Sequence, residues 1–212
     1  MRKAAVLITM VFFFFSLCAQ KKGFHQGAYV TNHGDTIKGF IHLPETGQSL
    51  KYKKAKTSTE TSDVPLDDLK SLVVNKGSYL VWYGKRSVTW LDPIELEIKN
   101  VDSFRTEMIM LKPVYEGSRY SLYEYKDETE RYFIGYAGIV EELKMNYRKL
   151  SEKEYREKSL LFSRPNYSVF AIYRQQIIEV LGDVTEFEKD MINHTEYNQQ
   201  HLKKLILEME KW

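Results

Sequence analysis

Carboxylates are the most numerous side chains in this sequence that could carry out chemistry. Two carboxylates on opposite sides of a groove are the minimum that a glycoside hydrolase needs. The candidates are Asp67, Asp68, Asp92, Glu95, Glu97, Asp127, Glu128 and Glu130. Because no spacing singles out a pair among them, we assign no catalytic residue and keep a glycan-directed hydrolase with an acidic pair as an alternative function.

The stretch VTNHGDTIKGFI, residues 30–41, places a histidine, an aspartate and a threonine around a glycine, between two runs of alternating apolar residues. Asn, Gly and Asp tolerate the backbone angles of tight turns. A functional site at His33–Thr36 would need a second cluster folded against it, and the sequence identifies none. We therefore predict that Asn32–Asp35 is the turn of a hairpin.

The sequence contains no clear metal-binding or cofactor-binding motif. Its histidines are His25, His33, His42, His194 and His201. His194 and His201 would lie about 10 Å apart along a continuous helix, too far to share one ion. The spacing of Gly77 and Gly84 does not fit a phosphate-binding loop, and no Gly-x-Ser-x-Gly motif is present. We predict no metal ligands, no cofactor-binding residues and no cofactor.

The lysines of KYKKAK, residues 51–56, admit two interpretations. On a strand, Lys51 and Lys53 would face one side, and Lys54 and Lys56 the other. Charges on both sides make a poor stripe for an anionic polymer, but they are typical of an exposed edge strand that must avoid aggregation. We favour the edge strand and keep anion binding as the alternative.

Aromatic residues make up 14% of the chain and include 15 tyrosines. Trp82, Trp90 and the tyrosines could line a sugar-binding platform. Aromatic residues on strands more often pair within a core, so we predict that role here. Their abundance in short alternating runs also favours a β-rich fold.

The first 19 residues have the layout of a secretory signal peptide. Arg2 and Lys3 precede the apolar run Ala4–Leu17, which is shorter than the roughly 20 residues of a membrane span. Ala19 is small enough to precede a cleavage point, so we expect the mature protein to start at Gln20. Lipid anchoring at Cys18 is the alternative; Leu17 argues against it, because that processing needs a small residue before the cysteine.

Removal of this leader would leave a protein without cysteine and without net charge. Of the 31 Lys and Arg residues, Arg2 and Lys3 lie in the leader, which leaves 29 basic against 29 acidic residues. A balanced charge provides no general attraction for nucleic acid. Since Cys18 is the single cysteine, the exported chain would have no disulfide and must be stabilised by its core.

Period-two alternation predicts a β-rich domain over residues 20–150. Hairpins are expected at Asn32–Asp35, at Gly84-Lys85-Arg86 and at Lys126–Glu130, because polar turn residues there separate aromatic and β-branched runs. Further strands are expected in LKYKKAK, LKSLVV, ELEI and EMIMLKPVY. We predict eight to ten strands, antiparallel because their connections are short.

Helical periodicity replaces this alternation in residues 151–212, for which we predict about three helices packed on the sheet. Capping boxes are expected at Ser151 with Glu154 and at Thr185 with Glu188. Pro165 interrupts the first helix, and Gly182 ends a second one. The apolar stripe of the second helix would be Phe170, Tyr173, Ile177 and Leu181. The apolar stripe of the last helix would be Leu202, Leu205, Ile206, Met209 and Trp212.

Four segments, GAYVTNHGDTIKGFI, VPLDDLKSL, VYEGSRYSLYEYKDETERYFI and YRQQIIEVLGD, resemble in order and spacing a family of uncharacterised exported proteins of Bacteroidota. The resemblance covers most of residues 27–183. It implies a location in the periplasm or cell envelope and supplies no catalytic residues.

These observations predict an exported α+β protein with a largely antiparallel β domain followed by a C-terminal helical segment. The function expected is a non-catalytic binding or adaptor module of the cell envelope. The alternatives are the glycan-directed hydrolase and an accessory subunit of an outer-membrane complex. An envelope protein or a glycan is the expected partner, with no nucleic acid and no transmembrane segment in the mature chain; the oligomeric state is left open.

Overall fold

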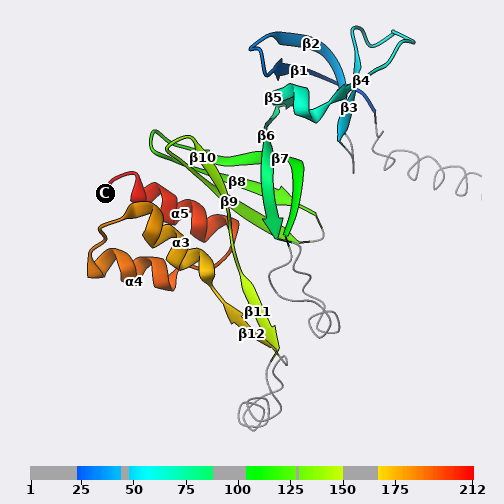
Figure 1. The fold of residues 1–212 in the computed structure, drawn as a ribbon. Helices are drawn as coiled ribbons and strands as arrows, with labels where there is room; N and C mark the ends of the chain where they lie inside the picture. Colours follow the sequence, from blue (N-terminus) through cyan, green and yellow to red (C-terminus); the bar gives the residue numbers. More distant parts are fainter. Residues whose placement is uncertain (1–22, 44–47, 88–103, 128, 150–166) are drawn as a thin grey trace, which may run out of the picture.

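The computed structural model describes residues 23–43, 48–87, 104–127, 129–149 and 167–212, with only the backbone described at 146–149 and 167–170 (Figure 1). These residues form a ten-stranded antiparallel sheet, a two-stranded ribbon and three C-terminal helices. The predicted α+β fold with a largely antiparallel sheet is confirmed. Several predicted features lie outside the described residues: the leader 1–19 with Cys18, Trp90, Asp92, the ELEI strand, Glu128, the Ser151–Glu154 capping box and Pro165.

The sheet has the strand order β10-β9-β8-β7-β6-β5-β1-β2-β3-β4. Its strands are β1 (His25–Thr31), β2 (Thr36–His42), β3 (Ser49–Lys53), β4 (Ser62–Pro65), β5 (Leu69–Val74), β6 (Gly77–Ser87), β7 (Phe104–Glu116), β8 (Tyr120–Lys126), β9 (Glu130–Tyr136) and β10 (Ile139–Leu143). A short 3-10 turn, η1 (Leu66–Asp68), returns the chain from β4 so that β5 pairs with β1. We call β1–β5 with η1 the N-terminal half, and β6–β10 with the helices the C-terminal half.

The ribbon pairs β11 (Asn146–Lys149) with β12 (Tyr167–Phe170), and the helices α3 (Ile172–Leu181), α4 (Glu186–His194) and α5 (Gln199–Met209) follow. The strand β12 lies inside the segment predicted to be helical. Phe170, expected on a helical stripe, is the last residue of β12, and the helix begins two residues later. The stop at Gly182 is confirmed: its φ of 78° is readily adopted only by glycine.

The capping box of α4 is also confirmed. The Thr185 amide and hydroxyl donate to Glu188 Oε2 at 2.6 and 2.7 Å, and the Glu188 amide donates back to Thr185 Oγ1 at 3.3 Å. These bonds satisfy backbone donors that the first turn of a helix leaves unpaired, so the sequence fixes where α4 begins.

The N-terminal half has a core on one face of the sheet. Its buried residues are Tyr29, Ile41, Leu50, Leu66, Leu69, Leu72 and Val74. Tyr29 meets Tyr52 edge to face with ring centroids 5.5 Å apart. Because side chains alternate along a strand, the residues between these core positions must point to the opposite face.

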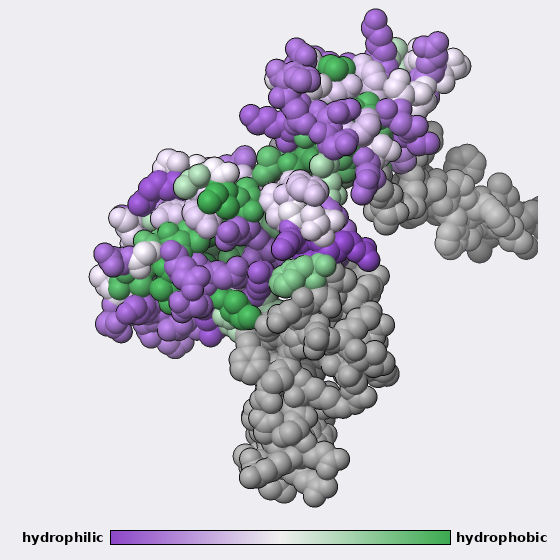
Figure 2. All heavy atoms as spheres, viewed as in Figure 1, coloured by the Kyte–Doolittle hydropathy of each residue, from purple (hydrophilic) through white to green (hydrophobic). Residues whose placement is uncertain are grey.

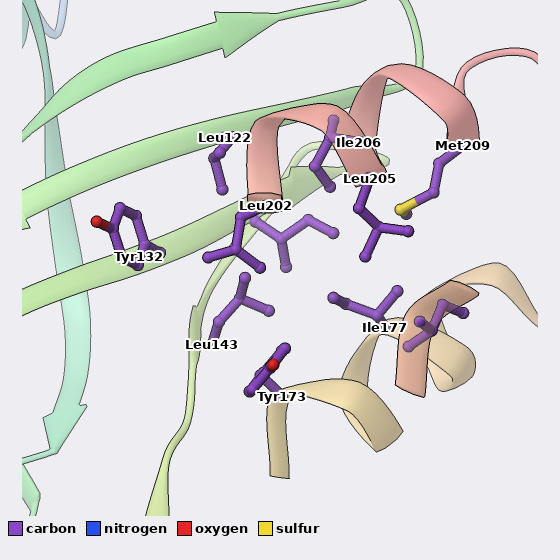
Figure 3. Close-up of a cluster of buried hydrophobic side chains, with 11 residues drawn as sticks. Leu122, Tyr132, Leu143, Tyr173, Ile177, Leu202, Leu205, Ile206 and Met209 are labelled. Carbon is purple, nitrogen blue, oxygen red and sulfur yellow. The ribbon is translucent and has the colours of Figure 1, made fainter. Parts of the chain in front are cut away.

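The C-terminal half has a larger core between the sheet and the helices (Figure 3). In Figure 3, Leu202, Leu205, Ile206 and Met209 of α5 point toward Leu122 and Leu143 of the sheet and Ile177 of α3. The predicted stripe of the last helix is confirmed, since all four of its residues within α5 are at most 2% exposed. Burial of this stripe, rather than helix propensity, holds the helices on the sheet.

The strand pair β6–β7 of the C-terminal half also packs against the core of the N-terminal half, because both of its faces are apolar. Tyr79, Val81, Met108 and Met110 pack against the core of the N-terminal half. Their neighbours of opposite parity, Leu80, Trp82, Ile109 and Leu111, form a third cluster with Tyr123 and Phe133 on the other face. This hairpin therefore joins the two halves through continuous packing.

The turn predicted at Gly84-Lys85-Arg86 is wrong, because these residues continue β6 to Ser87. Gly84 is required by a close approach rather than by a turn. A Cβ atom at this position would lie 2.3 Å from the Trp82 indole. The turns predicted at Asn32–Asp35 and Lys126–Glu130 are confirmed, the latter with the Thr129 amide donating to Asp127 Oδ1 at 2.9 Å.

Candidate functional site

Five charged residues converge at one end of the third cluster, on the face of β6–β10 that turns away from the helices. They are Arg86, Glu107, Asp127, Arg131 and Glu142, and we call them the arginine network. They come from β6, β7, the β8–β9 turn, β9 and β10, so only the curled sheet brings them together. Of the carboxylates named from the sequence, only Asp127 belongs to it.

Each charge in the arginine network has a partner of opposite sign. Arg86 donates to Glu107 and, at 2.6 Å, to Asp127 Oδ2. Arg131 lies 3.4 Å from Asp127 Oδ2 and 3.1 Å from Glu142 Oε1. Ser87 completes the set, because its amide and hydroxyl donate to the two oxygens of Glu142 at 2.6 and 2.7 Å.

This arrangement favours the ionised form of Asp127 and so argues against an acid–base role for that residue. Burial alone would raise the pKa of Asp127, but the Thr129 amide, Arg131 and Arg86 together lower it. A glycosidase acid needs the opposite, a carboxyl whose pKa is raised so that it holds a proton near neutrality. The arginine network therefore joins β10 back to β6 through ion pairs and hydrogen bonds.

Among the described residues, the contacts of the NHGDT turn are hydrogen bonds that stabilise the fold. The Thr31 amide donates to the Asp35 carbonyl at 2.9 Å, which closes the turn. The Asn32 amide donates to the Asp68 carbonyl at 2.9 Å, and its side chain donates to the Asp67 carbonyl. Asn32 therefore fastens the turn to η1, while His33 and Asp35 are exposed beside it.

The two C-terminal histidines each lie beside a carboxylate that is close in sequence. His194 Nδ1 lies 3.2 Å from Asp190, and His201 Nδ1 lies 3.3 Å from Glu196. In the described part of the chain, no three His, Cys, Asp or Glu side chains come together as a metal site.

The aromatic residues that the structure describes in the C-terminal half serve mainly as core. Trp82 Nε1 donates to the Val140 carbonyl at 2.9 Å, and its ring meets Phe133 at 5.0 Å. Burial and a hydrogen bond to Glu130 raise the pKa of Tyr132 to about 12. Neither ring is free to stack on a sugar.

The edge strand β10 is closed by side chains. The Val140 carbonyl accepts the hydrogen bond from Trp82 Nε1 described above. The side-chain amide of Gln176 bridges two backbone groups: Nε2 donates to the Glu142 carbonyl at 3.0 Å, and Oε1 accepts from the Lys144 amide at 2.8 Å. The Tyr173 amide donates to the Lys144 carbonyl at 2.8 Å. An incoming strand would have to displace these groups, so β10 is a poor site for strand addition.

The N-terminal half differs: within the described residues, the face of β5, β1, β2 and β3 opposite its core is only partly covered. Register places Ala28 beside Val73 and Val30 beside Ser71. Ala28, Val30 and Phe40 are partly exposed, and Val73 is 50% exposed. We call these four residues, together with Lys38, Lys51 and Lys53, the open face.

The lysines of KYKKAK do not lie on an edge strand, so that prediction is wrong. The strand β3 pairs with both β2 and β4, and β4 is the edge. Lys51 and Lys53 lie opposite His42 and Phe40 of β2 and share their side of the sheet. Lys54 and Lys56 follow the end of β3. The sequence did not reveal the open face, because Lys38 comes beside Lys51 and Lys53 only when β2 pairs with β3.

The other large apolar residues that are exposed in the described part of the chain come from five elements. They are Tyr83, Phe104, Ile139, Phe187 and Leu207, each on a different element. Figure 2 shows one side of the molecule, on which hydrophobic residues gather over the C-terminal half and at the junction of the halves, while the N-terminal half is mostly hydrophilic.

Comparisons with protein-family models, curated proteins and solved structures find no match for this chain. None of the helices in the described ranges is both long enough and apolar enough to cross a membrane. The geometry of the chain itself must therefore carry the functional argument.

Proposed function

We propose that this chain is a non-catalytic binding or adaptor module of the cell envelope that engages a protein partner through the open face. The observation that carries the proposal is the exposure of Val73, beside the partly exposed Ala28, Val30 and Phe40, on one sheet face of the described structure. A sheet face normally packs against another layer, and exposed apolar groups on one are a common feature of interaction sites. The signal-peptide layout and the resemblance to exported proteins of Bacteroidota support the location.

The state of the charged residues supports binding over catalysis. The described carboxylates that converge are those of the arginine network, and they are paired with Arg86 and Arg131. A hydrolase would instead need two carboxylates in different protonation states facing a substrate.

Site-specific photocrosslinking in the cells that produce the protein tests the proposal. Benzoylphenylalanine replaces Val73 on the open face or, as the matched control, Leu207, which is 39% exposed on α5. We expect a discrete adduct at position 73 and none of the same size at position 207. No adduct at position 73, or the same adducts at both positions, would contradict the proposal.

The hydrolase alternative has its own test. The purified chain is incubated with peptidoglycan and with soluble polysaccharides, and new reducing ends are measured. Release that disappears in both Glu107→Gln and Glu142→Gln, with folding intact, would replace the binding module by the hydrolase.

A further inference from the structure

We infer that the partner of the open face presents an apolar centre bordered by carboxylates. This inference rests on the proposed function and adds the chemistry of the partner. It follows from which side chains the strand register places together on this face.

The apolar centre consists of short side chains. Ala28 and Val73 are paired across β1 and β5, and Val30 is two residues further along β1 on the same side. These side chains are short, and they project from the same side of paired strands, next to an irregularity in the β1–β5 register between Val30 and Thr31. Short side chains at the centre let a second sheet or a helix approach closely, with the longer Lys38 beside them.

The border of the centre is cationic along β2 and β3. Lys38 lies opposite Ala28, Lys53 opposite Phe40 and Lys51 opposite His42. Lys53 Nζ also stacks over the Phe24 ring at 4.6 Å, which holds its ammonium group beside the face. Asp63 lies opposite Lys51, so three ammonium groups meet one carboxylate in this register. A partner with carboxylates at its rim complements this excess of positive charge.

The same charges argue against a second copy of this chain. A two-fold symmetric dimer would place the open face of one copy on the open face of the other. The lysine borders would then face each other, and like charges across an interface are unfavourable.

The shape argues against a membrane surface. Peripheral membrane proteins insert bulky Trp, Phe or Leu side chains from an amphipathic helix into the lipid. Of the four apolar residues of the open face, Phe40 alone is bulky, and it lies on a strand opposite Lys53, so the face offers little to insert. A protein surface is the better match.

The experiment combines the crosslinker at Val73 with charge reversal in the full chain. The test variant carries Lys38→Glu, Lys51→Glu and Lys53→Glu. The control variant carries Lys203→Glu, Lys204→Glu and Lys211→Glu, an equal change of charge at exposed lysines on and just after α5, away from the open face. Circular dichroism confirms that both variants fold. We expect the adduct to fall by about tenfold or more in the test variant and by less than about twofold in the control.

The outcomes separate the inference from the proposed function. An adduct that persists in the test variant leaves the binding module in place and overturns the acidic partner. No adduct in the unaltered chain contradicts both. An adduct with a second copy overturns the inference, and so does flotation of the purified chain with phosphatidylglycerol vesicles in place of a protein adduct. After the adducted protein is identified, reversal of its carboxylates to lysine should restore the adduct in the test variant.

Discussion

The N-terminal and C-terminal halves share one sheet but differ in how much of it they cover. In the C-terminal half, the helices pack on one face, and the curl of β6–β10 encloses the other. In the N-terminal half, one face has a core and the other is the open face. Residues Val30, Ser71, Leu80 and Leu111 lie in register across β1, β5, β6 and β7. A single row of side chains therefore runs from the open face into the enclosed cluster.

This difference locates the binding capacity of the molecule. The C-terminal half has closed its edge at β10 and paired the charges of its arginine network. The N-terminal half exposes apolar side chains that could have been covered, at a cost in stability of about 25 cal/mol for each Å² left in water. Three sets of substitutions and one pH dependence test the contrast.

The largest effect is expected from Arg86→Met in the arginine network. Arg86 is 7% exposed, and its removal takes the described ion-pair partner from Glu107 and leaves Asp127 with Arg131. Unpaired buried charge typically costs 3–5 kcal/mol, and partial exposure of the two carboxylates places this case at about 3 kcal/mol. Urea denaturation followed by circular dichroism measures the loss. The control Lys126→Met breaks an exposed pair with Glu130 and should cost less than about 1 kcal/mol. Equal losses of stability in the two variants would show that the arginine network stabilises the fold no more than an exposed ion pair does.

A neighbouring pair of valines compares the two faces of β5 directly. Val74 is 4% exposed in the core and Val73 is 50% exposed on the open face. Val74→Ser should cost about 2 kcal/mol through lost burial and an added buried hydroxyl. Val73→Ser should stay within about 0.5 kcal/mol of the unaltered chain. The same denaturation measurement decides, and a large loss at Val73 would mean that another part of the chain covers the open face.

Gln176→Ala should expose backbone hydrogen-bonding groups at the edge strand β10 and at Lys144. The substitution removes the partners of the Glu142 carbonyl and the Lys144 amide, at a cost of about 1–2 kcal/mol. Hydrogen exchange at the Lys144 amide should accelerate in parallel. The adjacent Gln175→Ala is the control, because Gln175 is exposed and bonds only to Glu179 among the contacts described. Unchanged exchange at Lys144 would show that Gln176 does not protect this edge.

Acidification should weaken the arginine network by a smaller amount. The folded pKa of Asp127 is below its ordinary value of 3.8, so its ionised form contributes stability at neutral pH. That contribution begins to fade near the ordinary pKa and is lost as the pH falls through the lower folded value. Denaturation between pH 6 and pH 3 measures this slope, and Asp127→Asn should flatten it. An equal slope in the variant would assign the pH dependence to other carboxylates.

Local features of the fold were predictable from the sequence because their causes are local. The Thr185–Glu188 capping box, the Gly182 stop and the stripe on α5 depend on residues within a few positions of one another. The failures depend on distant pairing. A glycine between two strand-like runs usually marks a turn. Gly84 instead lies within β6, because the indole of Trp82 leaves no room for a side chain there. Lys51 and Lys53 lie in an interior strand because β4 pairs beside them, which no short segment indicates. The arginine network draws on five elements, so its assembly follows from the curl of the sheet.

The double apolar character of β6 and β7 has a consequence for how the chain finds its correct pairing. In most sheets, a slip of one residue turns apolar side chains out to water, and that penalty fixes the register. Here a slip would exchange Tyr79 and Val81 for Leu80 and Trp82, so hydrophobicity would discriminate poorly between the two alignments. The register of β6 must therefore be determined by its few buried polar groups. A misaligned β6 would turn Arg86 away from Glu107 and Asp127 and Trp82 Nε1 away from the Val140 carbonyl. The few buried polar contacts of this hairpin thus encode an alignment that its hydrophobic residues leave undetermined.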